Sequence, residues 1–505
     1  MASKSKFQAI RGTRDLLPPE TALWNRVEET AHKVFGTFGF GEIRPPVFEE
    51  TELFVRSIGL ETDVVSKEMF SFLEGQVLEL PENFALWDEV VSEAWQRGEI
   101  PQTPQNKKQV LQLSQAYQEL RALFRGGATL NDQNVDSFIK LVRSMNKAVE
   151  RIAAHVTLRP EATASVCRAY IEHGMAQLPQ PVKLYYMGPM FRRERPQKGR
   201  YRQFYQIGAE VLGGGDAPAI DAEVIEMVMT FFDRLGLTGV ELDINSIGHN
   251  APECRPGYVQ KLKAALEQVK DKLGADSQRR IETNPLRVLD SKLEHEQAII
   301  ATLPRIADHL CAECAAHYAA VKRQLELRGV FFKENWRLVR GLDYYMRTTF
   351  EITAKGLGSQ NAVCGGGRYD GLVELLGGPP TKGIGFAIGE DRLILSLQEI
   401  GKGEFQRGRD VYIAWMGERA YATAVRAAKD LRNAGFSVEL PPTELKFGKA
   451  LERADKLGSR YALILGDNEV AEGSWTLKTL ADGTQQKLTE PELLEFLRSR
   501  KNLSS

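Results

Sequence analysis

The chain has 505 residues, of which 43% are hydrophobic and 26% are charged, and its formal net charge at pH 7 is -1. Because 66 Lys and Arg residues balance 67 Asp and Glu residues, the composition excludes a globally basic nucleic-acid binder, and any phosphate recognition must come from local patches. Five cysteines, an odd number in a long chain, argue against a disulfide framework and for a reducing compartment.

A chain of this length is expected to form roughly three or four domains, and its first predicted element is a helix over residues 20–39. Apolar side chains recur there at helical spacing, and Gly36 and Gly39 mark its end. The next segment, FGEIRPPVFEE, is expected to be extended. KEMFSF and VTLRPEAT are predicted strands, although about eighty residues separate them.

The block at 75–155 is predicted to hold three helices separated by GEIPQTPQ and RGGATLND. It is typical of a small helical module inserted at the tip of a hairpin, where insertions are tolerated best. Nine Lys or Arg residues against ten Asp or Glu residues give it no phosphate-binding character. We expect a bundle without a direct role rather than a docking element.

Strand-like runs KLYYMGPMF, RQFYQIGAEVLG and GVELDINSIG follow, with a helix from Ala219 to Leu235 between the last two. Residues 255–330 are mostly helical and suggest a second insertion. Strands are expected again in RLVRGLDYYMRTTFEITAK and QNAVCGGGRYDG. From about Arg407 onwards, DVYIAWMG, FSVEL and YALILGD alternate with helical stretches, which indicates a small α/β domain.

Three stretches far apart in the sequence are suited to a nucleotide. CGGGRYDGL has three consecutive glycines that let the backbone approach a ligand closely, and GIGFAIGEDRL turns from a strand into a helix with Arg392 in its first turn. The third stretch is rich in cations, which repel one another unless an anion binds them or water solvates them. That stretch, FRRERPQKGRYRQF at 191–204, holds Arg192, Arg193, Arg195, Lys198, Arg200 and Arg202.

With these stretches the sequence resembles histidyl-tRNA synthetase, a class IIa aminoacyl-tRNA synthetase, over nearly the whole chain apart from 75–155. The matching segments are RGTRDLLP, GFGEIRPPVFEETELF (motif 1), TLRPEAT, FRRERPQKGRYRQF (motif 2), RGLDYY, GGGRYDGL and GIGFAIGEDR (motif 3). Motifs 2 and 3 are shared by the class, whereas RGLDYY with GGGRYDGL points to histidine.

The resemblance implies an α+β catalytic core built on an antiparallel sheet, with helical insertions and a C-terminal α/β anticodon-binding domain. The core would comprise residues 1–74, 156–249 and 331–400, the insertions 75–155 and 250–330, and the anticodon-binding domain 407–505. The implied reaction activates L-histidine with ATP, helped by Mg²⁺, and transfers it to the 3′ end of histidine tRNA. Motif 1 further implies a homodimer.

The resemblance also assigns the ATP site residue by residue. Arg192 would hold the α-phosphate and Arg392 the γ-phosphate, while Arg340 would stabilise charge at the reacting phosphate and carboxylate. These roles suit guanidinium, which donates paired hydrogen bonds to phosphate oxygens. Phe204 would stack on adenine, although ordinary packing on the sheet is the alternative role for this ring. Glu194 would line the adenine end of the site.

A pocket for histidine must form hydrogen bonds with both the donor and the acceptor nitrogen of the imidazole. A wrong amino acid would leave buried polar groups of the pocket unpaired, which makes such a site selective. The residues implied for histidine are Glu161, Thr163, Arg192, Gln206, Glu210, Arg340, Tyr344, Tyr345 and Tyr369. At the tip of the motif 2 loop, Arg195, Gln197 and Lys198 would contact the acceptor end of the tRNA. The helix in TELKFGKALERADKLG is basic and suits phosphates.

Two residues depart from the family pattern: Glu390 stands where an apolar residue is expected, and Tyr205 where histidine is frequent. Cys254, Cys311 and Cys314, together with His249, His309 or His317, have partial zinc-ligand spacing. Because the second pair of ligands is incomplete, we favour free thiols, and no residue of the chain is assigned as a metal ligand.

Three other functions are compatible with parts of this sequence. A non-catalytic, synthetase-like regulatory subunit of histidine biosynthesis is disfavoured because the motif arginines and the C-terminal domain are present. RGLDYY with GGGRYDG argues against a synthetase for another amino acid, and a sensor of uncharged tRNA would carry a kinase domain. The start of the chain has no signal-like apolar run, which favours a cytoplasmic protein without membrane contact.

Overall fold

The structure, a computed structural model, describes residues 7–59, 62–74, 154–354, 361–402 and 408–502, with a few isolated positions between 96 and 119. The helical module predicted at 75–155 therefore lies almost wholly outside the described residues. The chain divides into two compact units, Met1–Asp15 with Arg26–Gly403, and Leu16–Asn25 with Glu404–Ser505.

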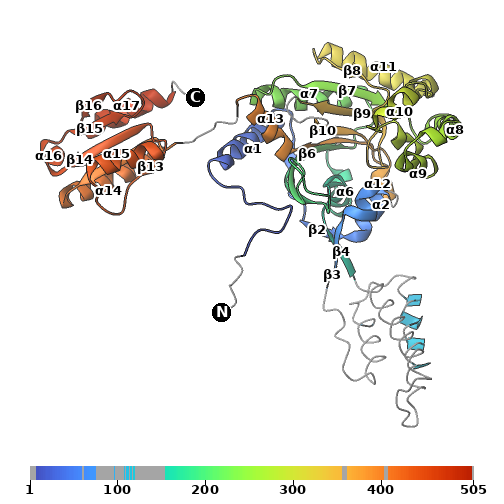
Figure 1. Ribbon diagram of the computed structural model, residues 1–505, viewed down its shortest axis with the longest axis horizontal. Coiled ribbons are helices and arrows are strands. Elements are labelled where there is room, and N and C mark those ends of the chain that lie inside the picture. Colours follow the sequence, from blue (N-terminus) through green and yellow to red (C-terminus); the bar gives the residue numbers. More distant parts are fainter. Residues whose placement is uncertain are drawn as a thin grey trace, which may run out of the picture. The chain divides into compact units, whose positions relative to one another are not determined.

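An eight-stranded sheet forms the centre of the first unit, in the order β1-β5-β6-β11-β10-β9-β7-β8 (Figure 1). Its six inner strands pair antiparallel, as predicted, and parallel pairing occurs at the two edges, β1 with β5 and β7 with β8. The strands are β1 (Gly41–Glu42), β5 (Val182–Phe191), β6 (Gln203–Leu212), β7 (Glu241–Ser246), β8 (Lys333–Glu334), β9 (Met346–Thr353), β10 (Ala362–Arg368) and β11 (Gly383–Gly389).

One face of this sheet is apolar and is covered by helices α1 (Glu20–Thr37) and α7 (Pro218–Leu235). The Phe35 ring of α1 lies 5.5 Å from Tyr185 of β5, 5.6 Å from Phe231 of α7 and 5.9 Å from Phe386 of β11. Since side chains alternate along a strand, the neighbours of Tyr185 and Phe386 point to the other face. That other face is where polar side chains gather.

The polar face owes its room to glycines that stand opposite long side chains. Glu210 of β6 pairs with Gly385 of β11, and Gly365 of β10 pairs with Glu351 of β9. Helix α6 (Thr163–Glu172) packs on this side, where its buried residues share a cluster with Tyr186 of β5. Helices α2 (Thr51–Ile58), α12 (Leu372–Leu375) and α13 (Glu390–Glu399) complete this part of the unit.

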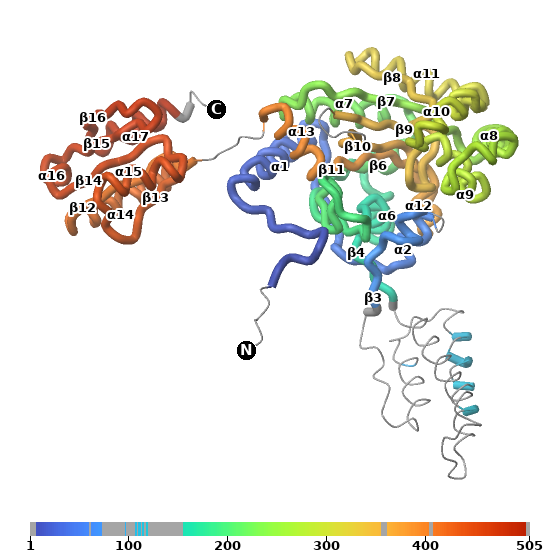
Figure 2. Tube along the Cα trace, in the orientation of Figure 1, coloured from blue at the N-terminus to red at the C-terminus, as the bar shows by residue number. Residues whose placement is uncertain are grey.

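A second, three-stranded sheet has the order β2-β4-β3, with β2 (Phe48–Glu50), β3 (Phe70–Glu74) and β4 (Ala154–Leu158). Strands β3 and β4 lie side by side in Figure 2 and pair antiparallel up to Glu74 and Ala154. The predicted strands here were too long: Val64–Glu68 forms a π-helical turn before β3, and VTLRPEAT leaves β4 after Leu158 to start α6.

Residues 255–327 contain four helices, α8 (Arg255–Glu267), α9 (Ala275–Thr283), α10 (Glu294–Ile300) and α11 (Ala312–Leu327). Their hydrophobic core includes Val339 and Tyr345 from the RLVRGLDYY segment. The strand expected to run through that segment begins only at Met346. The preceding residues form turns, which lets their side chains reach both the insertion and the polar face.

The second unit has a five-stranded sheet in the order β13-β12-β14-β15-β16, whose first three strands are parallel, as expected for an α/β domain. Its final strands form an antiparallel hairpin. The elements are β12 (Val411–Met416), α14 (Glu418–Asn433), β13 (Val438–Glu439), α15 (Phe447–Lys456), β14 (Tyr461–Gly466), α16 (Asp467–Glu472), β15 (Trp475–Thr479), β16 (Gln485–Leu488) and α17 (Glu490–Asn502). Among the described helices, none combines the length and the apolar character needed to cross a bilayer.

Candidate active site

The polar face of the large sheet borders a cavity of about 700 Å³. Three arginines that are far apart in the sequence, Arg192, Arg340 and Arg392, all line it. Five other residues that the resemblance assigned to the site also line it: Glu161, Glu194, Phe204, Gln206 and Tyr345. The cavity thus gathers cationic, carboxylate and aromatic groups, as a nucleotide and an amino acid would require.

Arg192 follows directly on β5 and is held from two sides. Its backbone N–H donates to Arg202 at 2.9 Å, and its side-chain Nε donates to the Pro160 carbonyl at 2.9 Å. The guanidinium carbon lies 5.3 Å from the centre of the Phe204 ring, within the range of a cation–π contact. Phe204 also packs on the cluster around Tyr186, so it both lines the cavity and supports the sheet.

Arg340 crosses the space above Gly365. A Cβ atom at position 365 would lie 2.0 Å from the Arg340 Nη2, so only glycine admits this guanidinium. Nη1 donates to Glu351 at 3.1 Å, whereas Nε is buried and has no hydrogen-bond partner among the described residues. A buried donor left without a partner is costly, and an anionic ligand would satisfy it.

Arg392 lies in the first turn of α13, where its Nη1 donates to the Ala362 carbonyl at 2.9 Å. Burial, together with the nearby positive charge of Arg200, lowers the pKa of Arg392. Arg200 itself pairs with Glu194 at 3.1 Å. Arg192 and Arg200 thus lie close enough to Arg392 to oppose its charge, and a triphosphate would neutralise this group of arginines.

Glu210 is fully buried near the C-terminal end of β6 and accepts two hydrogen bonds. Thr163 Oγ1 donates to it at 2.7 Å and Tyr369 Oη at 2.5 Å, and burial raises the pKa of Glu210 to about 8. Glu161 accepts from the backbone N–H groups of Thr163 at 2.7 Å and Ala164 at 3.0 Å, which caps α6, while burial raises its pKa. These contacts connect Glu210 to the cavity wall through Thr163.

Three tyrosines stand together beside these carboxylates. The ring centres of Tyr344 and Tyr345 are 4.7 Å apart, and those of Tyr344 and Tyr369 are 5.8 Å apart. Gly383 leaves room for Tyr369, whose ring would lie 2.3 Å from a Cβ at that position. Nearby, the Gln206 Oε1 is buried and has no partner within the described part of the chain, so it can still accept from a ligand.

The tip of the motif 2 loop stands apart from this cavity. Arg195, Gln197 and Lys198 are exposed and do not line it. Gln197 and Arg200 exchange backbone hydrogen bonds of 2.9 and 3.1 Å around a two-residue turn. Next to that turn, Arg200 lines the cavity and pairs with Glu194.

Several lining residues were not anticipated from the sequence. Arg279, Arg280 and Arg287 come from the 250–330 insertion, where they follow an ordinary helical pattern that carries no signal of a ligand. The carboxylates of Glu68 and Glu351 also line the cavity. Nothing in their local spacing distinguishes them from exposed acids, so only the fold could identify them.

The two departures from the family pattern lie side by side at the motif 3 helix. Glu390 is fully buried, its oxygens have no partners among the described residues, and burial raises its pKa well above the usual range. The adjacent Asp391 accepts from Arg14 at 3.2 Å and from the Tyr205 backbone at 3.0 Å. Glu390 does not line the cavity, whereas Tyr205 does.

The cysteines and histidines considered for zinc lie outside the cavity. His317 Nε2 contacts the Asp216 carbonyl at 3.1 Å, and His309 Nδ1 lies 3.3 Å from Lys261 Nζ, so neither faces a thiol. His249 does contact Cys314, at 3.0 Å. Carboxylates that line the active-site cavity, among them those of Glu68, Glu194 and Glu351, could hold Mg²⁺.

The family model of histidyl-tRNA synthetase matches residues 136–393, and that of an anticodon binding domain matches residues 410–500. A histidine–tRNA ligase from Koribacter versatilis is 45% identical over 98% of this chain and 96% of its own length. Another, from Solibacter usitatus, is 46% identical over 98% of this chain and 100% of its own. A crystal structure of apo S. aureus histidyl-tRNA synthetase is 31% identical, with a TM-score of 0.67, and covers 97% of this chain and 100% of that one. This chain therefore belongs to the histidyl-tRNA synthetase family.

Proposed function

We propose that this chain is a catalytically active histidine–tRNA ligase that forms histidyl-adenylate from L-histidine and ATP and transfers the histidyl group to histidine tRNA. The observation that carries the proposal is that Arg192, Arg340 and Arg392 line one cavity, whose wall at Glu161 is linked through Thr163 to the buried Glu210. The names of the full-length relatives agree with this activity.

In the first step a carboxylate oxygen of histidine attacks the α-phosphorus of ATP, and the bond from that phosphorus to pyrophosphate breaks. Negative charge accumulates on the phosphoryl oxygens, and fixed guanidinium groups stabilise it without reorganisation. We assign the α-phosphate to Arg192, the γ-phosphate to Arg392, and the reacting phosphate and carboxylate to Arg340. The unpartnered Nε of Arg340 supports its assignment.

In the second step a hydroxyl of the terminal adenosine attacks the carbonyl of the adenylate, and AMP leaves. We assign adenine to the Phe204 ring, because its face lies beside Arg192 at the edge of the cavity, and to Glu194. Mg²⁺ entering with ATP would neutralise the leaving pyrophosphate, and Glu68 and Glu351 are among the carboxylates lining the cavity that would hold it.

The amino-acid pocket is assigned to Glu161, Thr163, Gln206, Glu210, Tyr344, Tyr345 and Tyr369. Glu210 and Gln206 supply acceptors, and the tyrosines supply an apolar wall with hydroxyl groups. An amino acid without ring nitrogens would leave the buried Oε1 of Gln206 unpaired, so the pocket should reject it.

For the tRNA, the exposed tip residues Arg195, Gln197 and Lys198 would meet the acceptor end, and the 410–500 domain would bind the anticodon. Its helix α15 carries Lys449, Arg453 and Lys456 for phosphate contacts. We further propose a homodimer formed through motif 1 and a cytoplasmic location, where tRNA charging takes place.

The test is ATP–pyrophosphate exchange measured with each of the twenty amino acids, followed by charging of histidine tRNA. We expect exchange with histidine alone. Absence of exchange with any amino acid would support the regulatory alternative, and exchange with a different amino acid would overturn the substrate assignment.

A further inference from the structure

Four side chains with metal-ligand atoms meet outside the active-site cavity. His249 follows β7, Cys254 immediately precedes α8, and Cys311 and Cys314 lie at the start of α11. All four ligand atoms lie within 4.8 Å of one another. We propose that these residues bind one structural zinc ion, which fastens the 250–330 insertion to the catalytic core.

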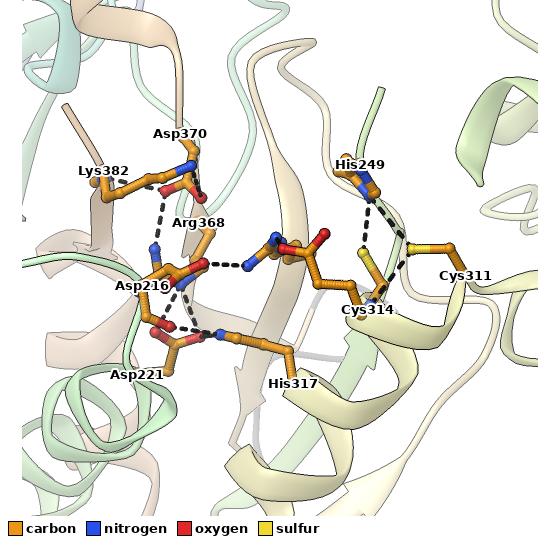
Figure 3. Close-up of polar contacts among 12 residues, drawn as sticks. Asp216, Asp221, His249, Cys311, Cys314, His317, Arg368, Asp370 and Lys382 are labelled. Carbon is orange, nitrogen blue, oxygen red and sulfur yellow. Dashed lines mark hydrogen bonds and ion pairs between the residues drawn. The ribbon is translucent and has the colours of Figure 1, made fainter. Parts of the chain in front are cut away.

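The distances suit tetrahedral coordination. His249 Nδ1 lies 3.0 Å from Cys314 Sγ and 3.7 Å from Cys311 Sγ, and Figure 3 shows the imidazole directed at both sulfurs. Zinc bonds of about 2.3 Å to sulfur and about 2.0 Å to nitrogen place tetrahedral ligand atoms roughly 3.5–3.8 Å apart. Shifts of about 1 Å or less at the side chains would therefore close the site around an ion.

Two of the sulfur ligands stand at the starts of helices. Cys254 and Cys311 each occupy the residue before a helix, α8 and α11, where the helix dipole is positive. Cys311 Sγ also accepts a hydrogen bond from the Cys314 backbone N–H at 3.4 Å, within the spacing Cys-x-x-Cys. With three thiolates and a neutral imidazole, the Zn²⁺ site would have a net charge of about -1. The positive side chain of the neighbouring Arg255 would compensate this charge.

Packing holds the ligands together without a metal. Cys254 and Cys314 are almost fully buried, and Gly248 permits the approach, because a Cβ there would lie 2.7 Å from Cys254 Sγ. The sequence had favoured free thiols because the second pair of ligands looked incomplete. His249, five residues before Cys254, supplies the missing position.

The site lies next to the segment that carries the histidine-specific residues. Arg255 Nη1 donates to the Tyr345 carbonyl at 2.5 Å, and the Arg347 backbone N–H donates to the Gly248 carbonyl at 2.7 Å. Gly248 and Arg255, which make these two contacts, are the chain neighbours of His249 and Cys254. A zinc ion bound at His249 and Cys254 would therefore hold both contacts in place. Because protein atoms fill all four coordination positions, the ion would be structural rather than catalytic.

The test measures metal in full-length protein purified without chelators from cells supplied with zinc. We expect about one zinc per chain by mass spectrometry, released when a mercurial modifies the thiols. Protein stripped of metal and titrated with Co²⁺ should show the visible absorption bands of tetrahedral thiolate coordination. Metal content does not depend on ligase activity, so this proposal and the proposed function fail separately.

Cys254→Ser and Cys314→Ser should lose the zinc, while Cys167→Ala, which removes a buried thiol of α6, should keep it. Cys311→Ser and His249→Ala change ligands that are less buried. They provide the same test of zinc loss if the first two variants fail to fold. The proposal is overturned by zinc-free wild-type protein, whether its thiols are free or joined in a disulfide, or by a folded ligand variant that retains full zinc.

Discussion

Gly365 leaves the space that the Arg340 guanidinium occupies, since a Cβ at 365 would lie 2.0 Å from Arg340 Nη2. The backbone of Gly365 does not require glycine, so Gly365→Ala tests this contact. We expect displacement of Arg340 to lower the rate of histidyl-adenylate formation by about 10²-fold. Gly36→Ala, at a helical position with nothing within 4 Å, is the control and should leave the rate unchanged. Equal rates for the two variants would show that adenylate formation does not require the Arg340 guanidinium to lie over residue 365.

Glu210 should give histidine recognition a distinctive pH dependence. Burial raises its pKa to about 8, so the free pocket holds a neutral carboxyl at pH 7, and a donor from histidine favours the ionised form. We expect kcat/KM for histidine to rise from pH 7 towards a plateau above about pH 8.

Glu210→Gln should abolish that rise and lower kcat/KM by about 10- to 100-fold, the loss of one charged hydrogen bond. Tyr369→Phe, which removes only one donor to Glu210, should keep the rise and shift its midpoint upward, because a donor to the carboxylate lowers the pKa. An unchanged profile in Glu210→Gln would rule out this carboxyl as its source.

Glu390 should destabilise the protein at neutral pH. Its folded-state pKa is raised, so the folded chain binds more protons than the unfolded chain and stability falls as pH rises above about 4.5. Glu390→Gln keeps the shape without the charge and should increase the free energy of unfolding at pH 8 by on the order of 1 kcal/mol.

The measurement for this position is the calorimetric midpoint at pH 6 and pH 8. We expect Glu390→Gln to raise the midpoint by about 2 °C at pH 8 and by less at pH 6. Glu399→Gln, at the exposed end of the same helix, should change neither value. A lower midpoint at pH 8 for Glu390→Gln would mean that the carboxylate makes stabilising contacts.

The loop tip should act on tRNA and not on adenylate formation. Arg195 and Lys198 are exposed and lie outside the cavity. The double variant Arg195→Ala/Lys198→Ala should raise KM for tRNA about 10-fold and weaken the salt dependence of charging, because each phosphate contact adds roughly one to the slope. Pyrophosphate exchange should stay at the wild-type rate. Lys333→Ala, an exposed lysine on β8, is the matched control.

Residue type, local spacing and the resemblance singled out Arg192, Arg340 and Arg392, and these three arginines line the same cavity. The strand and loop of FRRERPQKGRYRQF predict that Arg192, next to the strand, projects onto a face of the sheet, and the turn after GIGFAIG predicts Arg392 in a first helical turn. The antiparallel core followed from the resemblance and is confirmed by the pairing of β5, β6, β11, β10, β9 and β7.

Tertiary contacts decided the rest. The RGLDYY segment was expected as strand because of its aromatic and β-branched neighbours, but Tyr345 packs into the core of the insertion, and β9 starts at Met346. Arg287 reaches the cavity only because the insertion folds over Gly341, whose Cβ would lie 2.8 Å from Arg287 Nη1. These contacts join residues far apart in the chain, so no local periodicity in either segment predicts them.

The central claim is that Arg340 acts on the reacting phosphate and carboxylate, and single-turnover formation of histidyl-adenylate tests it most directly. Arg340→Ala should reduce the rate constant by about 10²–10³-fold while the chain stays folded, whereas Arg337→Ala, whose side chain contacts Gln297 instead, should stay near the wild-type rate. A folded Arg340→Ala protein that forms the adenylate at the wild-type rate would contradict the account.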